Sequence, residues 1–290
     1  MNIRLVRKKI KTVSNVKKIT RAMELVSAVK MKKSQQQALE GKPYRIYLEK
    51  IIQKLTTMLD PEFSPLMKKN NHPNAADLII FISSNKGLCG AFNFNLFRFL
   101  AKKVDIASSD FITVGKKGAM FVNKMGGKIL VDFSSIVAID SVSAIFQTAL
   151  TSYLEGKYNR VVIIYNKFIS TLRFEPTETV LLPFSKEIKI NEELSFSELK
   201  GLRGEYLIEP SPKTLIDFLL RSFIEEKIRE AVYDSEAAEH SARMLAMKNA
   251  TDNAQEVIYN LTLLRNKLRQ EKITYELLDM ITAKESVDTC

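Results

Sequence analysis

The first 59 residues show a helical pattern of hydrophobic positions. From Ile3 to Val29, apolar residues recur at steps of three or four, which is the spacing of one face of a helix. Neither glycine nor proline occurs before Gly41 and Pro43. The pattern therefore predicts a helix of about 40 residues, about 60 Å long, and such a length is typical of a coiled coil. Because proline removes a backbone donor and crowds the preceding turn, we expect Gly41 and Pro43 to kink or break the helix.

The C-terminal segment predicts a second and longer helix. Ser211 and Pro212 form a typical helix start, with serine as the cap and proline at the first helical position. No glycine or proline follows Pro212, so about 70 residues can form one uninterrupted helix, about 105 Å long. We expect the two terminal helices to pair antiparallel, because both connections to the intervening segment then stay short. The longer C-terminal helix should project alone beyond the amino terminus.

Alanine recurs at every fourth position in this second helix. The members of this alanine ladder are Ala238, Ala242, Ala246, Ala250 and Ala254. Small side chains in one row leave a shallow groove into which a second helix can pack closely. Alanine is also simply a good helix former, but the strict spacing over all the positions favours close packing.

The segment between the two long helices changes to strand-like patterns. The runs that predict buried strands are Leu78–Ile82, Phe111–Val114, Lys128–Phe133, Val161–Tyr165 and Thr179–Leu182. The helical stretches between them lie near Asn93–Val104, Lys116–Met125 and Ser141–Lys157. This alternation indicates crossover connections and a largely parallel sheet that is covered on both faces. The stretch from Arg160 to Pro183 has no room for a helix, so a hairpin there should add an antiparallel strand at one edge.

The sequence thus predicts an α/β protein with long helices. An antiparallel coiled coil of the N- and C-terminal helices is combined with a Rossmann-like, mostly parallel five-stranded α/β domain. The expected boundaries are residues 1–59 for the N-terminal coiled-coil helix, 77–190 for the α/β domain and 212–285 for the C-terminal coiled-coil helix.

Basic residues are concentrated in the first segment. The chain has 44 Lys and Arg against 33 Asp and Glu, a net charge of +11, and residues 1–59 alone have 15 against three. Such a segment favours an anionic partner, which can be nucleic acid, lipid headgroups or an acidic protein surface. A nucleic-acid-binding coiled coil is therefore an alternative function. Against it, the basic residues are interleaved with an apolar stripe, and the first 43 positions contain no aromatic residue for base stacking.

Motifs for catalysis and cofactor binding are largely missing. Gly87–Gly90 and Gly115–Gly118 follow predicted strands, but neither fits a P-loop or a dinucleotide fingerprint, so an NAD-type enzyme is disfavoured. Two cysteines and two distant histidines do not make a metal site, and Cys89 is expected to be a packed thiol. We find no nucleophile and base pair, so we expect neither an enzyme nor a cofactor. No run approaches the about 18 apolar residues of a membrane span, and the amino terminus does not fit a signal peptide.

Three stretches of the chain carry recognisable motifs in a fixed order. They are KITRAMELV at 18–26 with KMKK after it, SNKGLCG at 84–90, and EHSARMLAMKNATDNA at 239–254, which is followed by NKLRQ at 266–270 and ITYE at 273–276. These motifs, spread over nearly the whole chain, resemble the gamma subunit of F-type ATP synthase, the rotating central stalk. Two places depart from the family pattern: Asn85-Lys86 stand where it has Asp-Arg, and Ala283-Lys284 where it has Gly-Ala.

The resemblance implies a rotor subunit that has no active site and no cofactor. In this family the terminal helices form a coiled coil inside a hexamer of alternating alpha and beta subunits, and the α/β domain faces the membrane rotor ring. The implied partners are the alpha and beta subunits, the epsilon subunit and the ring of c subunits. The implied location is the cytoplasmic face of the bacterial inner membrane, as a peripheral protein without membrane insertion and without nucleic acid.

The resemblance also implies which residues contact partners or take part in coupling. They are Met23, Arg243, Arg269, Gln270, Thr274, Glu276 and Glu209. Counting the antiparallel pair from its loop ends places Met23 roughly level with Arg243. The apolar stripe of the projecting C-terminal tip is expected to bind the sleeve formed by the alpha and beta subunits, with Arg269 and Gln270 as polar contacts.

Overall fold

The computed structural model describes residues 2–58, 64–68, 70, 76–184, 209 and 211–288. The chain forms two compact units, one of Met1–Val29 with Arg243–Cys290 and the other of Lys30–Ala242. The long helices α1 (Ile3–Met58) and α5 (Pro212–Asp288) each contribute to both units. The two long terminal helices are therefore confirmed. The expected boundaries at residues 59 and 190 lie outside the described residues.

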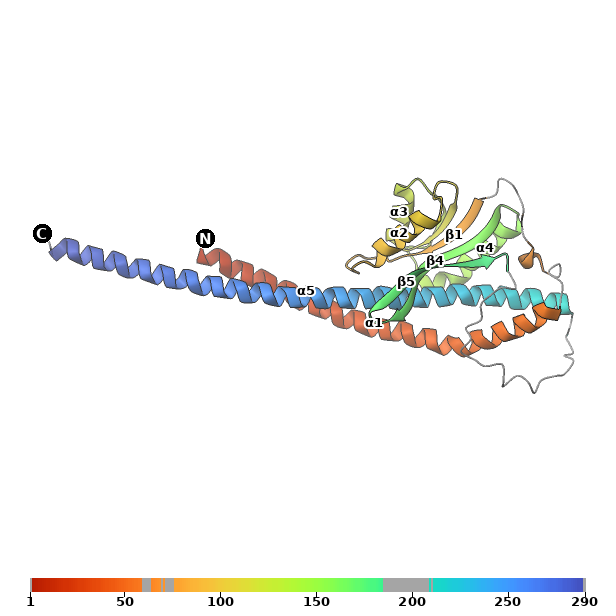
Figure 1. Ribbon diagram of the computed structural model, residues 1–290, viewed down its shortest axis with the longest axis horizontal. Helices are drawn as coiled ribbons and strands as arrows, with labels where there is room; N and C mark the ends of the chain where they lie inside the picture. Colours follow the sequence, from red (N-terminus) through yellow and green to blue (C-terminus); the bar gives the residue numbers. More distant parts are fainter. Residues whose placement is uncertain are drawn as a thin grey trace. The chain divides into compact units, whose positions relative to one another are not determined.

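A five-stranded sheet lies in the second unit (Figure 1). Its strands are β1 (Ala76–Ile82), β2 (Asp110–Val114), β3 (Lys128–Asp132), β4 (Tyr158–Ser170) and β5 (Arg173–Leu182). Their order is β3-β2-β1-β4-β5, with parallel pairing throughout except between β4 and β5, which form an antiparallel hairpin. The Rossmann-like sheet and its antiparallel edge strand are as the sequence predicts.

Helices cover both faces of this sheet. The remaining elements are α2 (Phe92–Lys103), α3 (Lys116–Lys124), α4 (Val142–Leu154) and the 3₁₀ turns η2 (Pro65–Met67) and η3 (Ala138–Ser141). Ile79 and Phe81 of β1 point into a core with α2 and α3, which Figure 1 shows together on one side of the strands. Leu78 and Ile80 point into a second core with α4 and with parts of α1 and α5. Burial on both faces explains why β1, β2 and the first part of β4 read as continuous apolar runs. The prediction that Lys128–Phe133 forms a buried strand is wrong in this respect, because β3 is an edge strand whose residues are exposed or half-buried.

Helix α1 continues through Gly41 and Pro43, so of the two predicted outcomes, a kink or a break, the break does not occur. Figure 1 shows a change of direction in the part of α1 drawn in orange, as expected for a proline kink. The guanidinium of Arg45 donates to the carbonyl oxygen of Ala38 at 2.9 Å, and this side-chain donor supports the turn that precedes the proline. A Cβ atom at residue 41 would lie 2.6 Å from Nη1 of Arg45, so the glycine makes room for this contact.

Candidate functional site

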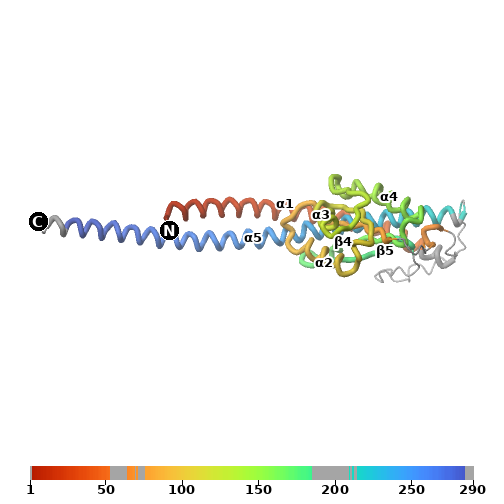
Figure 2. The backbone as a smooth tube through the Cα atoms, turned by 90° about the horizontal axis from the view of Figure 1, so that it is seen from above, coloured from red at the N-terminus to blue at the C-terminus, as the bar shows by residue number. Residues whose placement is uncertain are grey.

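Two buried threonines join α1 and α5 in the first unit. The hydroxyl oxygens of Thr20 and Thr251 lie 2.8 Å apart. Each hydroxyl also lies within hydrogen-bond distance of a carbonyl in its own helix, Thr20 of Lys17 at 3.1 Å and Thr251 of Met247 at 2.8 Å, so either threonine can donate across the helix pair. About one turn away, the ammonium of Lys17 donates to the side-chain oxygen of Gln255. The pair is thus antiparallel, as predicted, and Figure 2 shows these parts of α1 and α5 side by side.

Met23 and Arg243 lie at different levels of this helix pair. With Thr20 opposite Thr251, Met23 is level with about residue 248, which is about five residues, or about 7.5 Å, from Arg243. The prediction that the two are roughly level is therefore wrong by more than one helical turn. Counting from the loop ends cannot detect the local register, which the threonine contact sets. Met23 is half-buried, and its carbonyl accepts a hydrogen bond from the Ser27 hydroxyl at 2.7 Å, whereas Arg243 is buried.

The C-terminal tip of α5 has no side-chain cover within the described chain. Every side chain from Glu271 to Lys284 is exposed, and Figure 2 shows α5 continuing past the amino-terminal end of α1. The tip nevertheless keeps an apolar stripe, whose members are Ile273, Leu277, Leu278 and Ile281. An exposed apolar stripe of this kind marks a surface for another macromolecule. The prediction of a projecting C-terminal tip is thus confirmed.

The polar residues expected at the tip are exposed. Arg269 and Gln270 both lie on the solvent-facing surface of α5. The hydroxyl of Thr274 donates to the carbonyl of Gln270 at 3.0 Å, and Glu276 pairs with Lys272 at 3.1 Å. Both contacts lie within one helix, so these side chains stay accessible to a partner.

Glu209 lies just before the start of α5, in the second unit. Its side chain is exposed at a bend. Ser211 caps the helix as predicted, because its hydroxyl accepts a hydrogen bond from the backbone N–H of Thr214 at 3.3 Å. Glu209 and the other residues expected to take part in coupling thus belong to different units.

The alanine ladder has more than one neighbour. Ala238 packs with Cys89 and Phe92 of the α/β domain, as does the next alanine of the ladder. Ala254 is buried in the first unit, and the two positions before it are half-buried. A step of four residues turns an α-helix by about 40° more than one full turn, so five positions drift by about 160° around the axis. The prediction of a single groove for one helix did not include this drift.

Sequence analysis missed the details of a charged cluster in the second unit. The guanidinium of Arg45 on α1 lies 3.6 Å from the carboxylate of Glu230 on α5. The ammonium of Lys227 lies 2.7 Å from Glu49 and 3.2 Å from Glu230. In the first pair the cation lies on α1 and the carboxylate on α5, whereas in the pair of Lys227 and Glu49 the cation lies on α5 and the carboxylate on α1. The only residue of this cluster that stands out in the sequence is Arg45, because it lies just after Gly41 and Pro43.

Asp234 follows Glu230 by one helical turn in this cluster. Burial, and after it the negative charge of Glu230, raises the pKa of the Asp234 carboxyl to about 7. The cations Lys167, Arg45 and Lys227 act in the opposite direction. For Lys227 itself, burial lowers the pKa but the carboxylates of Glu230 and Glu49 outweigh it, so its pKa is raised. The cluster therefore contains a carboxyl group that exchanges its proton near neutral pH.

Among the residues that the structure describes, no group of three or more His, Cys, Asp and Glu side chains could hold a metal ion. Across the same residues, no helix combines the length and the apolar character that a membrane crossing requires. Cys89 is buried, as predicted for a packed thiol, and receives a hydrogen bond from the Asn93 amide at 3.3 Å.

Relatives of this chain are found along its whole length. The ATP synthase family model matches residues 2–287. The ATP synthase gamma chain of Verminephrobacter eiseniae is 37% identical over 285 residues, which cover 96% of this chain and 95% of the relative. The gamma chain of Akkermansia muciniphila is 33% identical over 292 residues, which cover 99% of each chain.

Solved structures show the same fold. One is the mitochondrial ATP synthase of Euglena gracilis, where the match covers 98% of this chain and 94% of that chain with a TM-score of 0.65 and 19% identity. Another is the central stalk and c-ring of the Tetrahymena thermophila enzyme, with coverage of 80% and 99%, a TM-score of 0.55 and 24% identity. Together with the full-length match to the family model and to the bacterial relatives, these findings show that the chain belongs to the ATP synthase gamma chain family.

Proposed function

We propose that this chain is the central-stalk rotor subunit of an F-type, proton-translocating ATP synthase. It couples rotation of a membrane ring to conformational change at catalytic sites on the beta subunits. As a gamma chain it is a non-catalytic subunit, and ATP is made and hydrolysed elsewhere in the complex. The observation that carries the proposal is the exposed apolar tip of α5 in a chain of this family. A nucleic-acid-binding coiled coil has no support in the relatives.

The partners follow from this function. The helix pair of the first unit turns inside a hexamer of alpha and beta subunits, while the second unit meets the epsilon subunit and the ring of c subunits. The assembly works as a peripheral part of the complex on the cytoplasmic face of the bacterial inner membrane. A rotor needs contacts that do not lock at one angle. Arg4, Arg7 and Lys8 are exposed on α1, and exposed ion pairs contribute only about 0–1 kcal/mol, so attraction to acidic loops of the beta subunits stays weak.

The tip of α5 gives the most direct experiment. Deletion of residues 285–290 should leave assembly and coupled ATP synthesis unchanged. Deletion from Arg269 onward removes the apolar stripe together with Arg269, Gln270, Thr274 and Glu276, and should weaken assembly with alpha and beta subunits and lower ATP synthesis. The measurements are co-purification of the complex and ATP synthesis in energised vesicles. A stable complex with full synthesis after the longer deletion would refute the tip as a bearing.

Coupling is tested separately at Met23. A lysine at this half-buried position adds a charge beside the surface that meets the beta subunits. Met23→Lys should therefore lower proton pumping and leave ATP hydrolysis largely intact. ATP hydrolysis and proton pumping are measured on the same vesicles. Equal losses of both activities would indicate that Met23 only packs in the helix pair.

A further inference from the structure

Helices α2 and α3 form one layer over the sheet in the second unit. The rings of Phe97 on α2 and Phe121 on α3 stack with their centroids 4.4 Å apart, and both helices pack on Ile79 and Phe81 of β1. Since both helices lie on the same side of the strands (Figure 1), the faces that they turn away from the sheet form one continuous outer surface.

This outer surface presents two large apolar side chains to solvent. Phe94 on α2 is 59% exposed, and Met120 on α3 is 65% exposed. They lie two residues from the buried Leu96 and Val122, and a step of two residues turns an α-helix by about 200°, so both point away from the sheet. The guanidinium of Arg98 lies over the Phe94 ring at 4.6 Å, which combines a cation and an aromatic ring at one point.

The same two helices are strongly basic. Neither α2 nor α3 contains aspartate or glutamate. The cations on them are all exposed, and they are Arg98, Lys102, Lys103, Lys116, Lys117 and Lys124. Lys128 on the neighbouring strand β3 pairs with Asp110 at 3.0 Å and is not counted. We call these six cations together with Phe94 and Met120 the α2–α3 surface.

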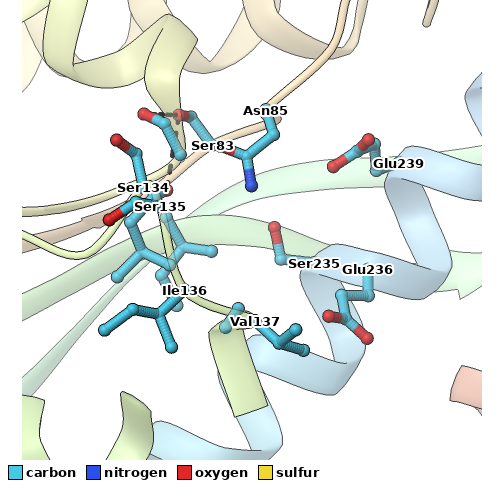
Figure 3. Close-up of a pocket in the computed structure, with 13 residues that line it drawn as sticks. Ser83, Asn85, Ser134, Ser135, Ile136, Val137, Ser235, Glu236 and Glu239 are labelled. Atoms are coloured by element: carbon cyan, nitrogen blue, oxygen red, sulfur yellow. Dashed lines mark hydrogen bonds between the residues drawn. The ribbon is translucent and has the colours of Figure 1, made fainter. Parts of the chain in front are cut away.

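The start of α3 does not offer its backbone to an anion. The N–H groups of Lys116 and Gly118 already donate to Asn85 Oδ1 at 3.0 Å and to Ser83 Oγ at 2.8 Å. Figure 3 shows Ser83 and Asn85 beside the cavity of about 320 Å³ at the carboxyl ends of β1 and β2. Because these donors are used within the fold, an anionic partner meets the side chains of the outer surface instead.

The composition of the α2–α3 surface favours a lipid bilayer over other anionic partners. Protein interfaces are depleted of lysine, whereas all the cations here except Arg98 are lysine. Duplex DNA is read by a helix that enters a groove, whereas α2 and α3 lie side by side. Clusters of about four to eight Lys and Arg beside exposed apolar side chains are typical of proteins that bind anionic lipid headgroups.

We propose that the α2–α3 surface binds the headgroups of an anionic lipid bilayer. Its cations attract the headgroups, while Phe94 and Met120 enter the boundary between headgroups and acyl chains. Exposed charges make weak contacts, so the binding is reversible and depends on the surface charge of the bilayer. The inference concerns the free chain and therefore does not depend on the rotor function.

Sedimentation of the full-length protein with vesicles tests the proposal. Vesicles of phosphatidylcholine with about 30% phosphatidylserine are compared with pure phosphatidylcholine at about 0.1 M salt, where charges act over about 10 Å. We expect binding to the anionic vesicles only. The combined variant Lys102→Gln, Lys116→Gln and Lys124→Gln should bind on the order of a hundredfold more weakly, because each cation near such a membrane contributes about fivefold.

The matched control removes the same charge from α1. Lys9, Lys11 and Lys18 are exposed in the first unit, and their combined replacement by glutamine should leave vesicle binding close to that of the wild type. This comparison separates the α2–α3 surface from the general basic character of the chain.

Tryptophan fluorescence reports on the contact itself, because the chain contains no tryptophan. Met120→Trp places one at the α2–α3 surface, and Tyr259→Trp places one on α5, where Tyr259 is similarly exposed at 62%. Vesicles with phosphatidylserine should shift the emission of Met120→Trp to shorter wavelength and leave that of Tyr259→Trp unchanged.

Several outcomes would overturn the proposal. They are no binding to the anionic vesicles, equal binding by the two combined variants, or no emission shift in Met120→Trp. Short duplex DNA and polyglutamate are tested in parallel as other polyanions. If the α2–α3 variant loses binding to either of them but keeps its binding to vesicles, the partner is that polyanion and the lipid proposal is refuted. The rotor function is tested separately, by co-purification with alpha and beta subunits.

Discussion

The pKa of Asp234 makes the stability of the second unit depend on pH near neutrality. In the folded chain, burial and then the charge of Glu230 raise this pKa from 3.8 to about 7. Between these values the folded state binds a proton that the unfolded state releases. The stabilisation of the folded state by this proton is therefore fully present below pH 3.8 and is lost as the pH rises through 7. We expect Asp234→Asn, which resembles the protonated carboxyl, to remove this dependence.

The size of the effect follows from the same values. At about 1.36 kcal/mol for each pKa unit, the difference between 3.8 and about 7 sets an upper limit of about 4 kcal/mol. Asp234 is only partly buried, and Lys167, Arg45 and Lys227 offset part of the cost of its charge. We therefore expect Asp234→Asn to be more stable than the wild type by about 2 kcal/mol at pH 8.5, with the difference decreasing as the pH is lowered and approaching zero only near pH 3.8.

Urea unfolding followed by circular dichroism, at several pH values from 5 to 8.5, measures this difference. Asp252→Asn is the control, because Asp252 is an exposed aspartate on the same helix. Carbon NMR of labelled aspartate carboxyls reports the pKa of Asp234 directly. A stability difference that does not change with pH, or an Asp234 pKa near 4, would contradict the reasoning.

Three further predictions concern the packing of the long helices, and thermal and urea unfolding checks each. Gly41→Ala should not give the gain of about 1 kcal/mol that alanine usually brings to a helix, because its Cβ displaces Arg45; in an Arg45→Met background the same change should stabilise by about that amount. Thr20→Val should lower the free energy of unfolding by about 1–2 kcal/mol. The double variant with Thr251→Val should lose less than the sum of the single variants, because it leaves no buried hydroxyl without its partner across the helix pair. Ala238→Leu should cost about 1–3 kcal/mol by overpacking, whereas leucine at the half-buried ladder positions should be tolerated.

The sheet could be predicted from sequence because its signals are local. Strands β1 and β4 contain continuous apolar runs, and the crossover helices show a helical period, so the alternation alone indicates a parallel sheet. The short connection between β4 and β5 leaves only a hairpin, and the structure has one. Strand ends were less well defined. β4 begins at Tyr158 and ends at Ser170, well beyond the apolar core of Val161–Tyr165, because pairing with β5 continues through polar residues.

Contacts between distant segments could not be predicted in the same way. Helix α1 is continuous through Pro43, and the side chain of Arg45 turns back to donate to the Ala38 carbonyl in the turn before it. Helix propensities of single residues give no information about this contact. The cluster around Asp234 needs residues from α1, β4 and α5, which only the folded chain brings together. The register of the helix pair depends on Thr20 and its partner, and two threonines in long helices have no distinguishing pattern.

The loop at Asn85 shows how a departure from a family motif can keep a structural role. The sequence has Asn85 where the family pattern has an aspartate. In the structure, Asn85 accepts a hydrogen bond from the N–H of Lys116 at the start of α3 at 3.0 Å, which asparagine does as well as aspartate. The substitution therefore keeps this cap while it removes one negative charge. We expect Asn85→Asp to leave the free energy of unfolding within about 0.5 kcal/mol of the wild type, because the same oxygen still accepts from Lys116, whereas Asn85→Ala should cost about 1 kcal/mol. Equal stabilities of the wild type and Asn85→Ala in urea unfolding would show that the side chain does not cap α3.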